Sequence, residues 1–195
     1  MKVDIYIPDK INCIASKKLI MARAGIPFSA QNDQSYIKEK VNKIYQECFS
    51  IFEPRIFYKN LDIKKIPLSI IPASFTNVTK LTIFISTIGK SLDNYLEKLY
   101  SENKIFEALI ADACGSESIE ALNRHFDSLL NNKVSRNCKT SLKRTRRFSP
   151  GYQDIDVKIN RLIYEKYFKN IDIEILKSGQ IIPRKSTICL IGWCI

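Results

Sequence analysis

The sequence predicts an α+β fold, in which a single domain over residues 1–195 is built around a twisted, largely antiparallel sheet with flanking helices. Runs of β-branched and aromatic residues bounded by Pro or Gly are typical of strands, and they cluster before residue 90. Stretches with apolar residues at three- and four-residue spacing are typical of amphipathic helices, and they separate those strands from further strands near the C-terminus. The 195 residues, 45% of them apolar, are enough for one core.

The N-terminal part combines one strand with two helices. We expect an opening strand over residues 2–7, a short helix over 16–24 that ends before Gly25, and an amphipathic helix over about 33–52. The apolar stripe of the last helix consists of Ile37, Val41, Ile44, Cys48 and Ile51. That stripe needs a sheet or another helix to cover it.

Strands dominate the middle of the chain, and two helices follow them. Three segments have the composition of strands: 55–58, 66–71 and 80–87. Ser91 can cap a helix that continues to about Ser101, and a longer helix covers roughly residues 104–131.

The C-terminal part predicts one more helix and two strands. The helix begins at Asp156 and ends near Asn170. Residues 172–176 and 186–191 then form strands on either side of a turn at Gly179.

The charge and the cysteine content restrict the function classes. The 31 basic and 20 acidic side chains give a net charge of +11, which favours an acidic partner: nucleic acid, a membrane surface or an acidic protein. The six cysteines include no C-x-x-C pair, so we expect reduced, mostly structural thiols. Because His125 is the only histidine, the composition disfavours zinc enzymes and Ser-His-Asp hydrolases, and we expect no metal site.

The N-terminus does not have the composition of a secretion signal. Asp4, Pro8 and Asp9 interrupt the apolar run that a signal peptide needs. The longest uncharged apolar stretch, residues 186–195, is too short to span a bilayer. We therefore expect a cytoplasmic protein without membrane contact.

An acidic residue lies on the apolar face of the predicted long helix. Phe106, Ile110, Ala113, Glu117 and Ala121 follow one another at spacings of four, three, four and four residues. A carboxylate buried there without a partner would cost several kcal/mol, so a cationic side chain or a ligand ammonium should meet it. The alternative is a glutamate at the edge of the stripe that reaches water. Small side chains in the same turn would let a backbone or a ligand come close.

Residues 147–152, Arg-Phe-Ser-Pro-Gly-Tyr, predict a turn with ligand-binding potential. Pro150 and Gly151 suit the two central positions of a type II turn. Arg147 offers a planar fork to a carboxylate, and Tyr152 offers a ring face to a sulfonium or an adenine. Pro-Gly turns are common, however, and most of them only reverse the chain.

A basic run overlaps this turn and supports an alternative function. Its members are Lys139, Lys143, Arg144, Arg146 and Arg147. Such a run suits a nucleic-acid-binding module, although no RNP-type aromatic strand, GXXG clamp or zinc knuckle accompanies it. A solvated surface is the other interpretation, and nucleic acid is the alternative rather than the expected partner.

Three segments, in this order, resemble the activation (reactivation) domain of cobalamin-dependent methionine synthase, and particularly its short stand-alone relatives. They are STIGKSLDNYLEKLYSENKIFEALIADACGSESIEAL (86–122), RRFSPGYQD (146–154) and IIPRKSTICLIGW (181–193). The first is similar to the family's "TIG" strand end and "DA-x-GSE-x-x-EA" helix, and the second to its Arg-x-x-x-Gly-Tyr motif. The third is similar to its closing strand. Residues 80–195 carry the match, and residues 1–80 agree in arrangement only.

The resemblance implies a site for S-adenosylmethionine (AdoMet) in the part of the chain from residue 80 to 195. The implied contacts are Glu117, Arg147, Ser149, Gly151 and Tyr152. We expect Arg147 to meet the carboxylate of AdoMet, Glu117 its ammonium, and Tyr152 its adenosyl-sulfonium end. The family transfers the methyl group of AdoMet to cobalamin that has been inactivated by oxidation, after an electron arrives from a redox protein. It needs no catalytic acid or base.

The resemblance also implies partners. No D-x-H-x-x-G cobalamin-ligand motif is present, because the only histidine lies in Asn-Arg-His-Phe, so the cobalamin should be carried by a corrinoid-binding methyltransferase chain. An acidic flavodoxin-like electron donor would be attracted by the charge of +11. The chain is then an accessory component of a cobalamin-dependent methyltransferase of the methionine synthase type, rather than an enzyme on its own. A divergent interaction protein that kept the fold without the ligand is a further alternative.

Overall fold

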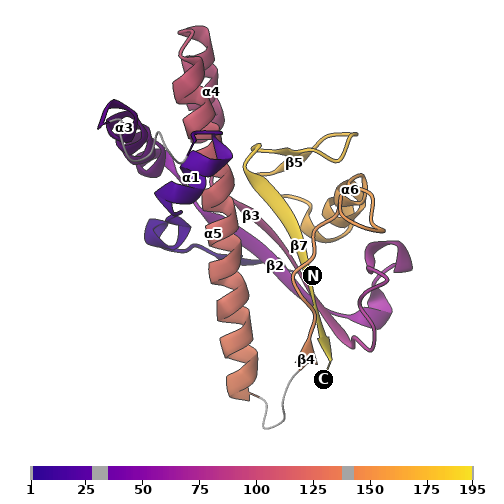
Figure 1. Cartoon of the computed structure of the whole chain (residues 1–195). Coiled ribbons are helices and arrows are strands. Elements are labelled where there is room, and N and C mark those ends of the chain that lie inside the picture. Colours follow the sequence, from indigo (N-terminus) through magenta and orange to yellow (C-terminus); the bar gives the residue numbers. More distant parts are fainter. Residues whose placement is uncertain (1, 28–34, 138–142, 195) are drawn as a thin grey trace.

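A five-stranded sheet forms the centre of the molecule. The computed structural model describes residues 2–27, 35–137 and 143–194 (Figure 1). The strand order is β1-β2-β3-β7-β4, and every neighbouring pair is antiparallel. The strands are β1 (Asp4–Tyr6), β2 (Arg55–Asp62), β3 (Lys80–Thr87), β7 (Ser186–Cys194) and β4 (Lys143–Arg144). The predicted α+β class with a largely antiparallel sheet is therefore confirmed.

Helices cover one face of this sheet. They are α1 (Lys17–Arg23), α3 (Ser35–Ile51), α4 (Ser91–Ser101) and α5 (Ile105–Asn137). Figure 1 shows the long α5 crossing the sheet, with α1 and α3 on the same side. No helix in the described ranges combines the length and the apolar character needed to cross a membrane.

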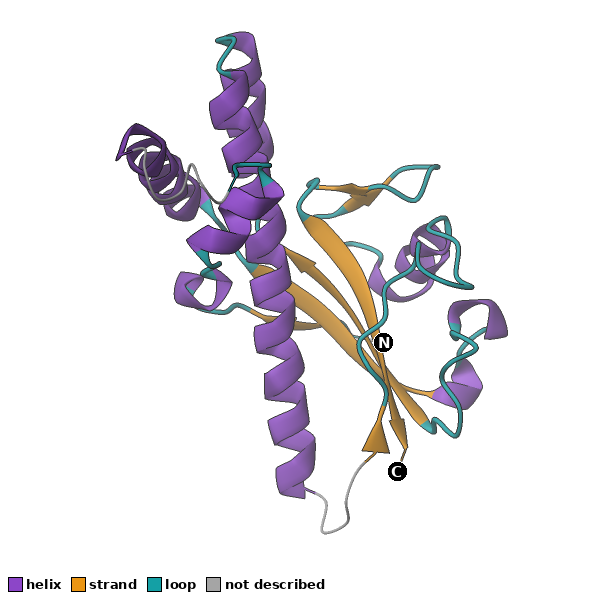
Figure 2. Cartoon of the chain, viewed as in Figure 1, coloured by secondary structure: helices purple, strands orange, loops and turns teal. Residues whose placement is uncertain are grey.

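The opposite face is covered by shorter elements, which Figure 2 shows among long loops. They are the 3-10 helices Ile63–Lys65 and Leu68–Ile70, α6 (Ile159–Ile163) with a π-helical turn over Tyr164–Phe168, and a hairpin of β5 (Glu174–Ile175) and β6 (Ile181–Ile182). A further 3-10 helix, Lys10–Cys13, follows β1 and belongs to the helical side. Alternate residues of β3 enter the two cores, since Phe84 packs under the helices and Ile83 and Ile85 pack on the other face. Both faces of the sheet are thus buried.

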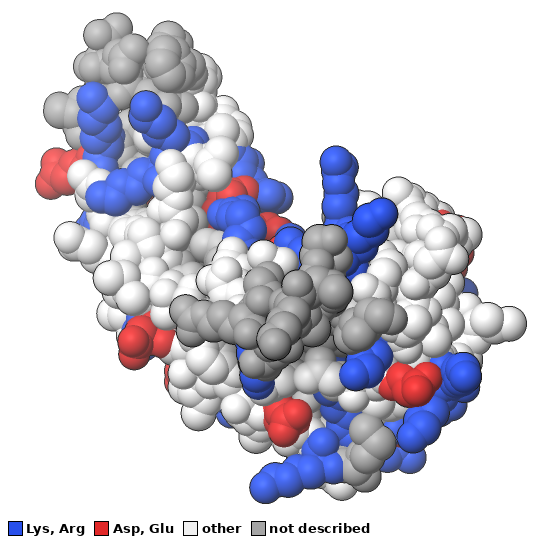
Figure 3. Space-filling view, turned by 90° about the horizontal axis from the view of Figure 1, so that it is seen from below, with Lys and Arg blue, Asp and Glu red and all other residues white. Residues whose placement is uncertain are grey.

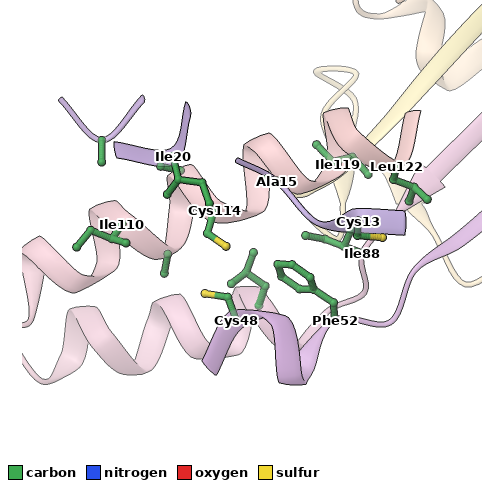
Figure 4. Packing of buried hydrophobic residues seen from close by; sticks show 14 of the residues in the cluster. Cys13, Ala15, Ile20, Cys48, Phe52, Ile88, Ile110, Cys114, Ile119 and Leu122 are labelled. Atoms are coloured by element: carbon green, nitrogen blue, oxygen red, sulfur yellow. The ribbon is translucent and has the colours of Figure 1, made fainter. Parts of the chain in front are cut away.

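The helical core contains most of the cysteines. Figure 4 shows Cys48 of α3 and Cys114 of α5 with their sulfur atoms directed towards each other among apolar side chains. Both residues are fully buried, as are Cys13 and Cys189, and all four carry free thiols. Cys138 lies outside the described residues. The described cysteines therefore act mainly as small apolar side chains in the core.

The segment 66–71 is not a strand, so that prediction is wrong. Residues Leu68–Ile70 form a 3-10 helix, in which the Ile70 N–H donates to the Pro67 carbonyl at 3.0 Å. Pro67 lies within the segment and Pro72 directly follows it, and neither has an N–H to give to a sheet. Local backbone bonds replace the strand ladder, and Leu68 is left 86% exposed.

Other elements differ in their ends. Ser91 is the first residue of α4 rather than its cap, and its hydroxyl donates to Glu53 at 3.3 Å. The long helix α5 continues to Asn137, beyond the expected end. Asp156 precedes the C-terminal helix and accepts the Lys158 N–H at 2.7 Å, and helical geometry begins at Ile159. An aspartate bonded to a nearby N–H in this way favours a turn before a helix.

Candidate functional site

The expected ligand-binding segment runs beside β7, after β4. Arg144 lies opposite Trp193, whereas Phe148 lies opposite Leu190. Four steps along this segment therefore match three steps along β7, so the segment contains one extra residue. A bulge of this kind redirects side chains. It allows both Arg144 and Arg147 to turn towards α5, although an unbroken strand would alternate them between the two faces.

Arg147 contacts a glutamate that was not among the expected site residues. Its Nη2 lies 2.6 Å from Glu120 Oε2, and the two side chains are 21% and 41% exposed. Glu120 follows Glu117 by three residues, and residues at this spacing lie on the same side of a helix. The sequence signal for Glu120 was its place within the Gly-Ser-Glu-x-x-Glu-Ala segment of the resemblance.

Glu117 is buried and has a cationic partner. It is 7% exposed, and its Oε1 lies 2.6 Å from the Nε of Arg23, the last residue of α1. We expected either a cationic side chain or a ligand ammonium to contact this carboxylate, and in the structure the side chain of Arg23 does so. Arg23 itself is half exposed, so the pair is open to solvent on one side.

The Pro-Gly turn has the conformation that its sequence predicts. Gly151 has a φ of +97°, in the region that favours glycine, and its N–H donates to the Ile155 carbonyl at 2.8 Å. Ser149 Oγ lies 3.3 Å from the Sγ of Cys189 on β7. The side chain of Tyr152 is 70% exposed, so its ring is accessible to a ligand.

Burial raises the pKa of Cys189 to about 11, above its ordinary value of 9.0. Between pH 9 and 11 the folded chain therefore keeps this thiol neutral, whereas the unfolded chain loses the proton. The contribution of the Cys189 thiol to stability is present below pH 9 and is lost as the pH rises through 11. We expect the free energy of unfolding to fall by about 2–3 kcal/mol over that interval through this group. Denaturant unfolding at several pH values should show that the free energy of unfolding falls less steeply with pH in Cys189→Ala than in the unaltered chain. Parallel curves for the two proteins would contradict this.

Ion pairs connect α5 to the surrounding segments. Besides the Arg147 and Arg23 pairs, Lys185 lies 2.8 Å from Asp112 Oδ1, and Arg144 makes a two-pronged contact with Asp127. Lys40 of α3 also lies 2.6 Å from Glu107, so five acidic residues of α5 each meet a cation from another part of the chain. The carboxylates of α5 are thus neutralised from outside the helix.

The small residues of α5 accommodate the protein's own side chains. A Cβ on Gly115 would overlap Leu92 Cδ2 and would lie 2.9 Å from Lys185 Cγ. Lys185 Nζ in turn contacts Ser116 Oγ at 2.8 Å. The close approach expected at this turn therefore comes from α4 and from the residue that precedes β7.

The structure brings the expected residues into one region without direct contact between the two principal ones. Glu117 pairs with Arg23, whereas Arg147 pairs with Glu120, and the cavity that Arg147 lines does not include Glu117. Ser149, Gly151 and Tyr152 follow Arg147 in the turn, where Ser149 contacts Cys189 of β7. The result is two ion pairs whose acids lie three residues apart on α5, and an exposed Tyr152 five residues after Arg147.

The basic run is only partly available for an external partner. Arg144 and Arg147 are engaged with Asp127 and Glu120, and Lys139 lies outside the described residues. This arrangement does not favour a continuous track for a nucleic-acid backbone, which needs several free cations in a row.

Comparisons with known proteins identify the fold. The chain matches no family model, and no curated protein matches it by sequence. Among solved structures, it matches that of the MetH reactivation domain bound to AdoHcy, with a TM-score of 0.64 and 11% identity over 98% of this chain and 78% of that chain. The chain has the fold of the MetH reactivation domain.

The match to the MetH reactivation domain extends over the whole described chain. Because 98% of the chain is covered, it includes the N-terminal 80 residues, in which the sequence resembled the family in arrangement only. The position of α1 is therefore part of the shared fold. At 11% identity the likeness is one of fold.

Proposed function

We propose that this chain binds AdoMet between α5 and residues 147–152, and that it serves the reductive methylation of cobalamin on a partner methyltransferase of the methionine synthase type. The observation that carries the proposal is the Arg147–Glu120 ion pair, at 2.6 Å, in the fold of a domain whose solved structure contains AdoHcy. The pair presents opposite charges side by side, which is the complement of an amino acid's carboxylate and ammonium.

The donor set fits the amino-acid end of AdoMet. Arg147 would receive the carboxylate, and one of the two α5 glutamates, Glu117 or Glu120, would receive the ammonium. Glu120 is the more accessible of the two, at 41% exposure of its side chain, whereas Glu117 is already paired with Arg23. Binding would exchange the internal Arg147–Glu120 contact for two contacts to the ligand, so that no buried charge is left without a partner.

The turn would hold the other end of the ligand. The exposed ring of Tyr152 can face the sulfonium or stack on the adenine, an attraction of about 0.5–2 kcal/mol. Ser149 and Gly151 would contribute contacts along the intervening chain. AdoMet supplies an electrophilic methyl group on its sulfonium, and the protein's part is to orient the ligand and to exclude competing reactions.

The cobalamin would come from the partner chain. His125, the only histidine of the sequence, has its Nε2 2.9 Å from the Tyr6 hydroxyl and stacks on the Tyr6 ring. Its role in this structure is thus part of the packing between β1 and α5. An acidic electron donor would be attracted by the net charge of +11.

Glu120→Gln is expected to weaken AdoMet binding about tenfold, because an amide cannot neutralise the ligand ammonium as a carboxylate does. Isothermal titration with AdoMet measures the effect. Asp127→Asn is the matched control, since Asp127 lies on the same helix and also pairs with an arginine of the 143–147 segment. Glu117→Gln tests the other assignment. Unchanged affinity in both glutamate variants would contradict a role for α5 in holding the ammonium.

A further inference from the structure

A separate cavity lies at the β4 end of the sheet. It has a volume of about 610 Å³ and is bounded by residues 74–77 on one side and 143–148 on the other, with Gln153 and Cys194 between them. Cavities of 300–1,000 Å³ are typical of small-molecule sites. Glu117, Glu120 and Tyr152 do not line it, so it is distinct from the proposed AdoMet site, although Arg147 contributes to its wall.

All the charged residues that line this cavity are basic. Four cationic residues line it, namely Lys143, Arg144, Arg146 and Arg147, and its lining contains no acidic residue. Arg144 and Arg147 direct their guanidinium groups to carboxylates of α5. Lys143 and Arg146 are exposed, and within the described parts of the chain neither has an ion-pair partner. Figure 3, which views the molecule from below, shows Lys and Arg side chains exceeding Asp and Glu on this face.

The remaining lining combines hydrogen-bonding groups with an apolar base. Ser74, Thr76, Asn77 and Gln153 bring hydroxyl and amide groups to the cavity. Its apolar base is formed by an edge-to-face pair of Phe75 and Phe148, whose ring centroids lie 6.1 Å apart.

Each wall of the cavity is held by hydrogen bonds to a neighbouring segment. The Ala73 N–H donates to Asp154 Oδ2 at 2.7 Å, which connects the 74–77 segment to the turn that follows Tyr152. On the other wall, the Thr145 N–H donates to the Gly192 carbonyl at 2.9 Å, and Thr145 Oγ1 accepts the Gly192 N–H at 2.8 Å. The cavity is therefore part of the folded framework.

We propose that this cavity is a second binding site, for a phosphate-bearing ligand of nucleotide size. Two unpaired cations at the rim, with neighbouring hydroxyl and amide donors, match the charge and the several acceptor oxygens of a phosphate group. An anion bound here would also neutralise Lys143 and Arg146, which have no carboxylate partner among the described residues. A bounded hollow with two free cations suits a small ligand better than a polymer, which needs a longer row of charges.

The test is a titration of the full chain with inorganic pyrophosphate and, separately, with ADP at 150 mM NaCl. The unaltered chain is expected to bind both in the micromolar to low millimolar range. Lys143→Ala/Arg146→Ala should weaken both at least tenfold. ADP that binds more tightly than pyrophosphate would show that the base also contacts the cavity. Lys18→Ala/Lys38→Ala is the matched control, since it removes two exposed charges from α1 and α3 and should leave both affinities unchanged.

Three outcomes would overturn the proposal. The first is that neither pyrophosphate nor ADP binds at 10 mM ligand. The second is that the two double variants lose the same amount of affinity. The third is that the chain binds a single-stranded oligonucleotide but neither of the two small ligands. The last would indicate a nucleic-acid surface instead. AdoMet titration of Lys143→Ala/Arg146→Ala keeps this proposal apart from the proposed function, because neither residue belongs to the AdoMet site and that affinity should not change. Circular dichroism confirms that each variant is folded.

Discussion

Arg147→Ala is expected to weaken AdoMet binding at least about 100-fold while the chain remains folded. The arginine is the cation that the 147–152 turn directs towards α5, and the structure places it in contact with Glu120 at 2.6 Å. Without it, the ligand carboxylate would have no partner in that position and would face the Glu120 carboxylate instead. Loss of an attraction and gain of a repulsion act in the same direction, which makes this the largest expected effect on binding.

The stability of this variant should change little. The Arg147 and Glu120 side chains are 21% and 41% exposed, and ion pairs in such positions contribute about 0–1 kcal/mol to folding. The backbone at this position does not depend on the side chain, since Phe148 maintains both hydrogen bonds to Leu190 at 2.9 and 2.8 Å. Thermal unfolding should therefore show nearly the same midpoint as for the unaltered chain.

The control for this variant is Arg144→Ala. Arg144 lies in the same segment, turns to the same helix through the same bulge, and pairs with Asp127. It lies outside the proposed contacts, so its loss should leave AdoMet affinity within about twofold. Equal loss of affinity in both variants would mean that general positive charge, rather than a specific carboxylate contact, attracts the ligand. Undiminished affinity in Arg147→Ala would contradict the proposed site.

Much of the fold could be predicted because local patterns and tertiary structure agree. The strand predicted over 80–87 has those bounds in the structure, and α4 spans 91–101 as expected. The prediction of a strand over 66–71 was wrong, because the composition favoured a strand while Pro67 within the segment and Pro72 after it prevented one. The long helix extends further than predicted, to Asn137, because its apolar pattern fades before the helix itself ends.

The contacts within the site were less predictable, because they form between residues that are far apart in the sequence. The sequence correctly placed Glu117 on a buried helix face, but the identity of its partner, Arg23, depends on how α1 packs against α5. Glu120 lies opposite Arg147 because of a one-residue bulge against β7, and no local pattern specifies that slip. Contacts of this kind follow from register, which becomes known only when both strands are in place.

Gly115→Val is expected to lower the free energy of unfolding by about 3 kcal/mol. A side chain at this position of α5 would collide with Leu92, which is fully buried, and with the aliphatic part of Lys185. Leu92 lies in the helical core, where close packing leaves a side chain little room to move. Gly115→Ala should destabilise less, because the better helix propensity of alanine offsets about 1 kcal/mol of the strain. Denaturant unfolding followed by circular dichroism measures both changes, and Ser128→Val, at an exposed position of α5, is the control for a β-branched residue in this helix.

The Gly115 variants also separate two explanations for the small residues of α5. If the glycine serves packing, stability should fall in Gly115→Ala, and Lys185→Ala should recover part of the loss because it removes one of the colliding side chains. If the glycine instead admits a ligand, Gly115→Ala should lose AdoMet affinity at unchanged stability. The structure favours packing, since Lys185 spans this turn with contacts to both Asp112 and Ser116 at 2.8 Å. Lys185 immediately precedes β7, the strand against which residues 145–148 are aligned, so the glycine fixes the spacing between the α5 acids and the turn that carries Arg147.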